Sequence, residues 1–263
     1  MEYAGAIILG ILQGIFEWLP VSSEGIVTLA GKLIYGMQYQ DSLAMAIWLH
    51  IGTLAAVVAY FRKDIMEMLK SIYTTGANRD LLVFLAVSTF ASAIVALPLI
   101  ILAFSEQAAL IPEYAFTIMI GIFLVGIALL QKTQKINVGD QKLTPINALV
   151  AGLAQGIAVL PGMSRSGVTV ATLLYEKYNV ENALKLSFLM SIPVTAGAQL
   201  TLPLAKGGYA ITGPMVAGAL AAAITGFLTI GWLLEFARKE NFYKATLVLG
   251  ILVILIGIIY AFT

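Results

Sequence analysis

Long runs of apolar residues without a single charge dominate the chain. About 20 consecutive apolar residues are enough for a helix to cross the hydrocarbon core of a bilayer. Charge-free runs of about this length or longer occupy residues 42–61, 81–105, 114–131, 186–205, 207–234 and 245–263. Each run predicts one transmembrane helix, and the Gly and Pro residues near one end shorten the fifth to 213–234. The pattern therefore predicts an all-α polytopic membrane protein.

The Lys and Arg residues of the loops predict the orientation, because cytoplasmic loops collect them. The loop at 62–80 is basic, the loop at 106–113 contains only acidic charges, and the loop at 132–144 is basic again. This alternation places the first and third of these loops inside the cell and the second outside.

Two further segments must then dip into the membrane without crossing it. The basic residues at 177–185 and 235–244 fall on the cytoplasmic side only if segment 145–175 enters and leaves on that side. By the same reasoning, residues 1–35 form a matching dip from the outer face. We therefore expect six transmembrane helices plus two re-entrant helical hairpins.

The two dips also share sequence. Gln-Gly-Ile at 13–15 matches Gln-Gly-Ile at 155–157, and a proline and a Ser-x-x-Gly stretch follow in both. Three predicted spans come after each dip. The chain is therefore expected to be a single membrane domain, 1–263, whose halves, 1–132 and 143–263, form an inverted-topology repeat. In such folds the sites lie near the midplane, where broken helices meet.

Composition supports the membrane assignment and excludes several functions. The chain has 263 residues, of which 60% are hydrophobic and 11% charged, whereas soluble domains carry about 25% charged residues. The absence of cysteine excludes disulfides, thiolate metal sites and cysteine nucleophiles. A net charge of +1 gives no case for nucleic-acid binding. The substrate is therefore expected to come from the lipid or to cross it.

The first dip contains polar residues that need partners inside a membrane. Gln13 and Glu17 are four residues apart and share one face of a helix. Pro20 then breaks the helix, and the Ser-Ser-Glu-Gly stretch at 22–25 suits a turn and a new helix start. An ionisable side chain at membrane depth costs about 2.5–3.5 kcal/mol. Glu17 and Glu24 therefore need a metal ion, a cation or a shared proton, and with Gln13 they are the candidate metal ligands.

The second dip carries an arginine in a loop of small residues. After Pro161 the chain reads Gly-Met-Ser-Arg-Ser-Gly. Backbone N–H groups that lead into a helix N-terminus form an anion site, and an arginine fork suits phosphate oxygens. The candidate phosphate-binding residues of both dips are Ser22, Gly162, Ser164, Arg165, Ser166 and Gly167. Together with the carboxylates, they predict a site for a phosphate ester or diphosphate bridged by Mg²⁺ or Ca²⁺.

Simpler structural roles are open for the same residues. Arg165 could form a buried pair with Glu17 or Glu24 that only locks the two dips together. The serines of the dips could cap helix starts, and the glutamines at 13 and 155 could bind backbone groups freed by the breaks. For His50, the only histidine, packing or an interhelical hydrogen bond is the favoured interpretation.

These motifs resemble those of the undecaprenyl-diphosphate phosphatase family, also called the bacitracin-resistance proteins. Residues 13–23 (QGIFEWLPVSS) look like the first signature of the family, and residues 161–167 (PGMSRSG) look like the second. Segments 48–53 and 187–193 are also similar to family segments. The resemblance covers nearly the whole chain, in order and with similar spacing.

The resemblance implies a dimeric enzyme of the plasma membrane with two re-entrant hairpins. Such an enzyme would remove the terminal phosphate of an undecaprenyl-type polyprenyl diphosphate and recycle the lipid carrier for cell-envelope glycans. The resemblance also implies a divalent cation and an active site open to the outer face.

The chain departs from the family pattern at two positions. Gln13 stands where the first motif often has a glutamate, which leaves one carboxylate in that pair. Ile26 stands where the family usually has a histidine, and isoleucine cannot transfer a proton or contact phosphate. Glu24 is the first candidate to replace the lost acid/base or ligand function, and His50 is the less favoured one.

The leading interpretation is metal-assisted hydrolysis of a polyprenyl diphosphate. Glu17 and Glu24 would hold the cation, and Arg165 would stabilise the departing phosphoryl group. Ser23 is the candidate nucleophile, and attack by a water molecule activated by the cation is equally compatible with the sequence. The main rival is a transporter or flippase that moves polyprenyl phosphate without cleaving it, because transporters also use inverted repeats with broken helices. A non-catalytic scaffold would leave the buried charges unexplained.

Overall fold

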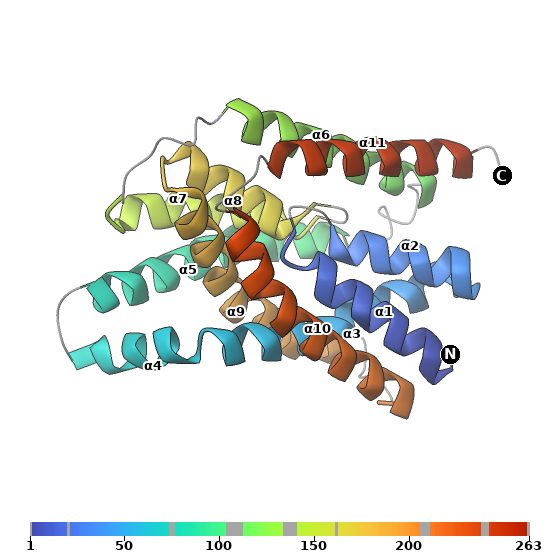
Figure 1. Ribbon diagram of the computed structural model, residues 1–263, viewed down its shortest axis with the longest axis horizontal. Helices are drawn as coiled ribbons and strands as arrows, with labels where there is room; N and C mark the ends of the chain where they lie inside the picture. Colours follow the sequence, from blue (N-terminus) through green and yellow to red (C-terminus); the bar gives the residue numbers. More distant parts are fainter. Residues whose placement is uncertain are drawn as a thin grey trace.

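The computed structural model describes residues 2–19, 22–73, 77–103, 113–133, 141–160, 163–205, 211–237 and 242–261, and throughout these ranges the regular elements are helices (Figure 1). In chain order they are α1 (Tyr3–Phe16), α2 (Ser23–Tyr35), α3 (Tyr39–Tyr60), α4 (Arg62–Lys70), the 3-10 helix η1 (Ser71–Tyr73), α5 (Ala77–Ala103), α6 (Glu113–Thr133), α7 (Pro145–Ile157), α8 (Arg165–Tyr175), α9 (Val180–Ala205), α10 (Gly213–Ala237) and α11 (Phe242–Ala261).

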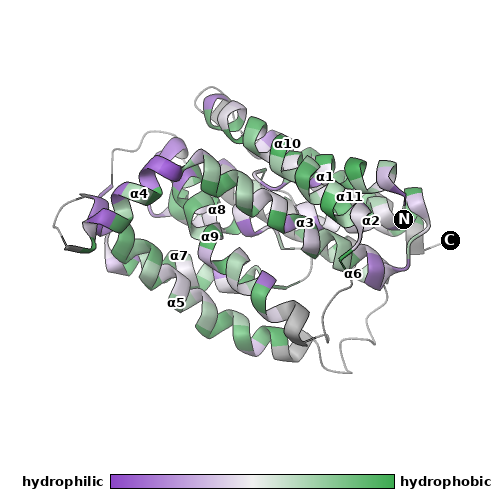
Figure 2. Cartoon of the chain, turned by 90° about the horizontal axis from the view of Figure 1, so that it is seen from below, coloured by the Kyte–Doolittle hydropathy of each residue, from purple (hydrophilic) through white to green (hydrophobic). Residues whose placement is uncertain are grey.

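Long apolar helices make this an integral membrane protein. Within the described residues, four helices are long and apolar enough to cross a bilayer: Tyr39–Tyr60, Asn78–Ile100, Glu181–Thr201 and Gly213–Glu235. They belong to α3, α5, α9 and α10. The other two charge-free runs form α6 and α11, which pack along each other (Figure 1) and are not among these four. Hydrophobic residues cover most of the long helices, whereas hydrophilic residues gather at α4 (Figure 2).

The four helices of the two predicted dips are too short to cross a bilayer. α1 has 14 residues, α2 and α7 have 13 each, and α8 has 11. At 1.5 Å per residue these helices are about 16–21 Å long, and the hydrocarbon core is about 30 Å thick. α1 contacts α2, and α7 contacts α8. The two predicted dips are thus two pairs of short helices, each pair joined through a break.

The two short pairs pack against the opposite half of the chain. α1 lies along α10, and α7 lies along α5 (Figure 1). Glycines allow the close approach: a Cβ added at Gly10 would lie 2.1 Å from the Gly218 carbonyl oxygen, and one at Gly152 would lie 2.4 Å from the Ser88 carbonyl oxygen. Small residues are the usual means by which membrane helices approach so closely.

Aromatic packing holds the first break in place. Trp18 is almost fully buried, and its Nε1 donates to the Gly226 carbonyl oxygen of α10 at 3.0 Å. Its ring also meets Phe188 of α9 edge to face, with 5.2 Å between ring centroids. Because Trp18 follows Glu17 directly, these contacts fix the backbone that carries the Glu17 carboxylate.

A buried tyrosine joins the two ends of the second pair. The Tyr178 hydroxyl, just after α8, donates to the Lys142 carbonyl oxygen at 3.0 Å. It accepts from Asn147 Nδ2, in the first turn of α7, at 3.2 Å. The chain therefore returns after α8 to the place where α7 begins.

Candidate active site

Serine caps start the second helix of each short pair. The Ser22 hydroxyl accepts from the Gly25 N–H at 3.1 Å, so α2 begins at Ser23. The Ser164 hydroxyl accepts from the Gly167 N–H at the same distance, so α8 begins at Arg165. A serine at this position satisfies an N–H group that the helix itself cannot pair. Capping was the simpler role left open for these two serines, and both play it.

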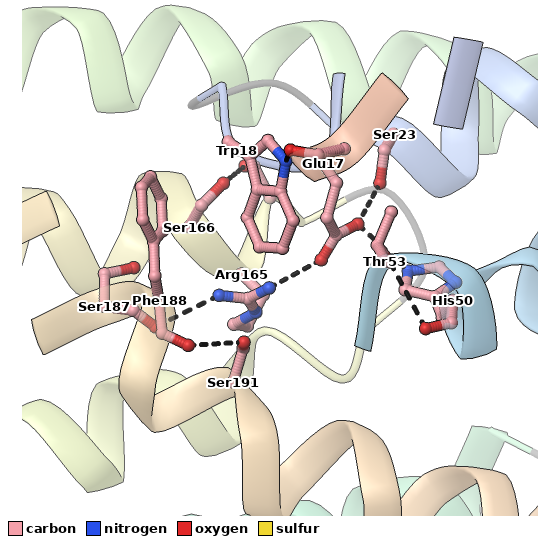
Figure 3. A network of polar contacts seen from close by, with 12 residues as sticks. Glu17, Trp18, Ser23, His50, Thr53, Arg165, Ser166, Ser187, Phe188 and Ser191 are labelled. Carbon is pink, nitrogen blue, oxygen red and sulfur yellow. Dashed lines mark hydrogen bonds and ion pairs between the residues drawn. The ribbon is translucent and has the colours of Figure 1, made fainter. Parts of the chain in front are cut away.

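Glu17 is the centre of a polar cluster between the two breaks (Figure 3). Its side chain is buried, with 7% of its surface exposed. Carboxylate oxygen Oε2 accepts from Gln13 Nε2 at 2.9 Å and from the Ser23 hydroxyl at 2.7 Å. The other oxygen, Oε1, accepts from Arg165 Nη2 at 2.5 Å. Residues of both short helix pairs thus contact the same carboxylate.

Arg165 and Ser166 connect the second break to its surroundings. Arg165 Nη1 donates to the Ser187 carbonyl oxygen of α9 at 3.2 Å. The Ser166 hydroxyl donates to the Leu19 carbonyl oxygen in the first break at 2.7 Å. Glu17 of the first dip and Arg165 of the second, which the sequence predicts to share one site, are therefore in contact, and the hydrogen bond from Ser166 to Leu19 also joins the two breaks.

His50 reaches the same carboxylate from α3. Its Nε2 lies 3.3 Å from Glu17 Oε2, and its Nδ1 lies 2.8 Å from the Ala46 carbonyl oxygen. Figure 3 shows Arg165 and His50 on different sides of Glu17. The contact is interhelical, as favoured from the sequence, but its partner is the central acid. His50 therefore belongs to the site, although its place on another helix made it the less favoured substitute.

The other predicted residues lie at different distances from this centre. Glu24 is half-buried and lies within electrostatic range of the Glu17 and His50 side chains. Gln155 is not in the cluster, because its Nε2 donates to the Ser92 hydroxyl of α5 at 2.9 Å. Pro20, Val21, Pro161 and the predicted phosphate-binding residue Gly162 lie outside the described residues.

The oxygen atoms near Glu17 suit a divalent cation that would take some of its ligands from the protein and the others from a substrate. Gln13 Oε1 is buried without a hydrogen-bond partner in the structure, and amide and carboxylate oxygens are suitable ligands for Mg²⁺ or Ca²⁺. Within the described ranges no group of three His, Asp or Glu side chains could hold a metal ion. Substrate phosphates would therefore have to supply further ligands, as is usual for Mg²⁺.

Two helix N-termini face this cluster. Ser23 opens α2 and Arg165 opens α8, and both touch Glu17. The first N–H groups of a helix have no partner within the helix, and they attract anions. The Arg165 guanidinium is the charged donor beside these two helix starts.

Several contributors to the site could not be named from the sequence. The carbonyl oxygens of Leu19 and Ser187 receive hydrogen bonds from the second break, and any residue type could supply them. Trp18 and Phe188 meet edge to face beside Glu17 and Arg165 (Figure 3). Their presence in segments that resemble the family was the one available signal.

Comparison with known proteins gives matches along nearly the whole chain. A family model described as bacitracin resistance protein BacA matches residues 6–259. The undecaprenyl-diphosphatase of Methanococcoides burtonii is 37% identical over 266 residues, which cover 97% of this chain and 98% of that protein. The undecaprenyl-diphosphatases of Haloarcula marismortui and Moorella thermoacetica are 35% and 34% identical, over 97% and 94% of this chain and 97% and 93% of their own lengths.

Proposed function

Because the chain belongs to the bacitracin resistance protein BacA family, we propose that it is a membrane phosphatase. It hydrolyses a polyprenyl diphosphate of the undecaprenyl type to the monophosphate and inorganic phosphate, and so recycles the lipid carrier for cell-envelope glycan synthesis. One observation carries the proposal: the buried Glu17 carboxylate of the first break forms an ion pair with Arg165 of the second, beside the Ser23 hydroxyl.

The Ser23–Glu17 pair supports nucleophilic attack by serine. The hydroxyl donates to the carboxylate at 2.7 Å, which is the distance of a nucleophile and its base. In the proposed step Ser23 Oγ bonds to the terminal phosphorus, its proton passes to Glu17, and the bond from that phosphorus to the bridging oxygen breaks. The lipid monophosphate leaves, and water then hydrolyses the phosphoserine to free phosphate and restores the hydroxyl.

Arg165 has two partners in this scheme. Without substrate it neutralises Glu17, and a bound phosphate group competes for the same guanidinium. When Arg165 turns to the phosphate, it binds the charge that develops on the transferred group. Glu17 then loses a cation and becomes a better base for the Ser23 proton.

Glu17, Gln13 and Glu24 would hold a divalent cation, which would neutralise part of the diphosphate charge. The unpaired Gln13 Oε1 supports this ligand set. Gln13 also donates its amide to Glu17 Oε2, so the same side chain orients the carboxylate.

The proposed membrane arrangement has six transmembrane helices and two re-entrant hairpins in an inverted repeat. Three features support it: the short helices of the two pairs, the tie between Tyr178 and the start of α7, and the packing of α1 on α10 and of α7 on α5. Exchange of the two halves converts the α1–α10 contact into the α7–α5 contact. A homodimer in the plasma membrane with its site open to the outer face follows from the family resemblance.

Phosphate release by the purified protein tests the function. We expect release from undecaprenyl diphosphate in Mg²⁺ or Ca²⁺, loss in EDTA and recovery on adding the cation back. Glu17→Gln and Arg165→Lys should each lower kcat/KM by about 100-fold or more, since each removes a charge or a hydrogen bond at the reacting group. Glu67→Gln, the same carboxylate-to-amide change on the surface of α4, is the matched control.

A wild-type protein that releases no phosphate above the Arg165→Lys level would reject the phosphatase. If that protein nevertheless moved polyprenyl phosphate across liposome membranes, the flippase interpretation would replace it.

A further inference from the structure

His50 is held in a fixed orientation by its own helix. Its Nδ1 lies 2.8 Å from the Ala46 carbonyl oxygen, one helical turn earlier on α3. A carbonyl oxygen can only accept a hydrogen bond, so Nδ1 carries a proton and donates it. This bond fixes the ring so that Nε2 points away from α3 and toward Glu17. Only 18% of the His50 side chain is exposed.

The contact between His50 Nε2 and Glu17 Oε2 is within ion-pair distance, with 3.3 Å between the two atoms. Oε2 therefore has three side chains beside it: Gln13 and Ser23 donate hydrogen bonds to it, and His50 lies in ion-pair contact. Packing alone would not aim this nitrogen at the one oxygen that also accepts from Ser23.

We infer that His50 is a positioning residue of the reaction, which holds Glu17 Oε2 against the Ser23 hydroxyl. This inference rests on the proposed phosphatase function. Arg165 binds only Oε1, and the proposed mechanism draws it toward the phosphate. His50 lies on the long helix α3 and keeps its place beside Glu17 when Arg165 moves. It therefore keeps the carboxylate aligned with Ser23 at the moment when the arginine leaves.

Two substitutions of similar shape separate positioning from packing. In His50→Gln the side-chain amide nitrogen occupies the place of Nε2 and still donates to Glu17. In His50→Asn the amide reaches only the place of Nδ1. We expect kcat of His50→Asn to fall by about 100-fold, the usual cost of a misplacement of about 1 Å, with KM within about twofold. His50→Gln should keep kcat within about fivefold of wild type, and both variants should melt at similar temperatures.

Trp48→Phe is the matched control on the same helix. Trp48 lies two residues before His50, but its Nε1 donates to the Met215 carbonyl oxygen of α10 at 2.9 Å and not to Glu17. The variant should therefore keep the wild-type kcat. Wild-type turnover by His50→Asn, or equal losses in His50→Asn and His50→Gln, would overturn the positioning role.

The single histidine also gives a readout that does not depend on activity. In protein labelled with ¹⁵N-histidine, both ring nitrogens that appear belong to His50. Glu17→Gln should shift the Nε2 resonance and leave that of Nδ1 nearly in place, and an unchanged spectrum would overturn the inference. If wild type and Trp48→Phe release no phosphate, the phosphatase proposal fails, and the ring spectrum still decides whether His50 holds Glu17.

Discussion

Glu17 depends on its neighbours because a buried carboxylate is costly by itself. The effective penalty for burying an ion is several kcal/mol, and removal of one partner from a buried pair costs about 3–5 kcal/mol. Arg165, Gln13, Ser23 and His50 surround this carboxylate. The same contacts that stabilise the charge also aim it, so stability and activity are linked at this residue.

Two neighbouring serines with different partners allow a role in the reaction to be separated from a role in stability. Ser23 donates to Glu17, whereas Ser22 caps α2. Ser23→Ala should lower kcat by about 10²-fold or more, since it removes the nucleophile, and should change the melting temperature little. Ser22→Ala should cost about 1 kcal/mol of stability and keep a larger part of the activity. Phosphate release and thermal melting in detergent check both variants, and equal activity losses would remove the special role of Ser23.

Glu176 gives the protein a stability that depends on pH. Burial raises the pKa of this carboxyl from its ordinary value of 4.5 to about 7, and its Oε2 is buried without a hydrogen-bond partner in the described structure. Between these two values the folded state keeps a proton that the unfolded state has lost. Stability therefore falls as the pH rises from about 4.5 to 7, and the full cost of ionisation is present above 7.

Glu176→Gln should remove this pH dependence. Its melting temperature should exceed that of wild type at pH 8, and the difference should shrink toward pH 5. Melting curves of the two proteins at both pH values make the comparison. A difference that stays constant with pH would mean that Glu176 does not titrate in this range.

At this scale the sequence predicted the residue types of the site better than their partners. The charges of Glu17 and Arg165 each needed a partner in a membrane, and the sequence left open whether Arg165 would pair with Glu17 or with Glu24. The place of His50 did not follow, since it depends on the angle at which α3 passes the first break. The separation of Gln155 from the cluster depends on the packing of α7 against α5.

Glycines control the helix contacts between the two halves. A Cβ at Gly10 would lie 2.1 Å from the Gly218 carbonyl oxygen, and one at Gly152 would lie 2.4 Å from the Ser88 carbonyl oxygen. Backbone atoms cannot move aside as a flexible side chain can. Gly10→Ala and Gly152→Ala should therefore each cost about 1–3 kcal/mol, as overpacking does.

Gly126→Ala on α6 is the control for these variants, because a Cβ there meets nothing within 4 Å. This change should be neutral or slightly stabilising, since alanine favours a helix over glycine. Thermal melting in one detergent compares the three proteins. Similar melting temperatures would show that the helices can move apart at these glycines without loss of stability.

The elements of the chain followed from the sequence more completely than their packing did. Each charge-free run coincides with a helix, and the two breaks lie where Pro, Gly and Ser cluster. α4 was not anticipated, because residues 62–70 carry enough charge to be assigned to a loop. The contact of α1 with α10 joins segments about 200 residues apart in the chain, and local patterns carry no information at that range.

Cysteine labelling tests the topology of the whole molecule, and the chain offers a background without native cysteine. Ile146 and Tyr175 are both exposed, each 72%, near the start of α7 and the end of α8. If 145–175 is re-entrant, single cysteines at these two positions react with an impermeant maleimide from the same side of the membrane. A crossing segment would place them on opposite sides.

Met66 in α4 and Ile211 before α10 provide the reference positions, since both are exposed. We expect cysteine at 66 to label from the same side as 146 and 175, and cysteine at 211 to label from the other side. Labelling of 66 and 211 from one side would reject the six-span arrangement.

The pairing of α1 with α10 also has a consequence for biosynthesis. The ribosome makes α1 about 200 residues before its principal neighbour, α10. Until α10 is made, the first helix pair lacks its glycine-mediated neighbour, and until residue 165 is made it also lacks the arginine that pairs with Glu17. We therefore expect insertion to finish late, with the first hairpin accessible to protease in truncated nascent chains and protected once translation has passed α10.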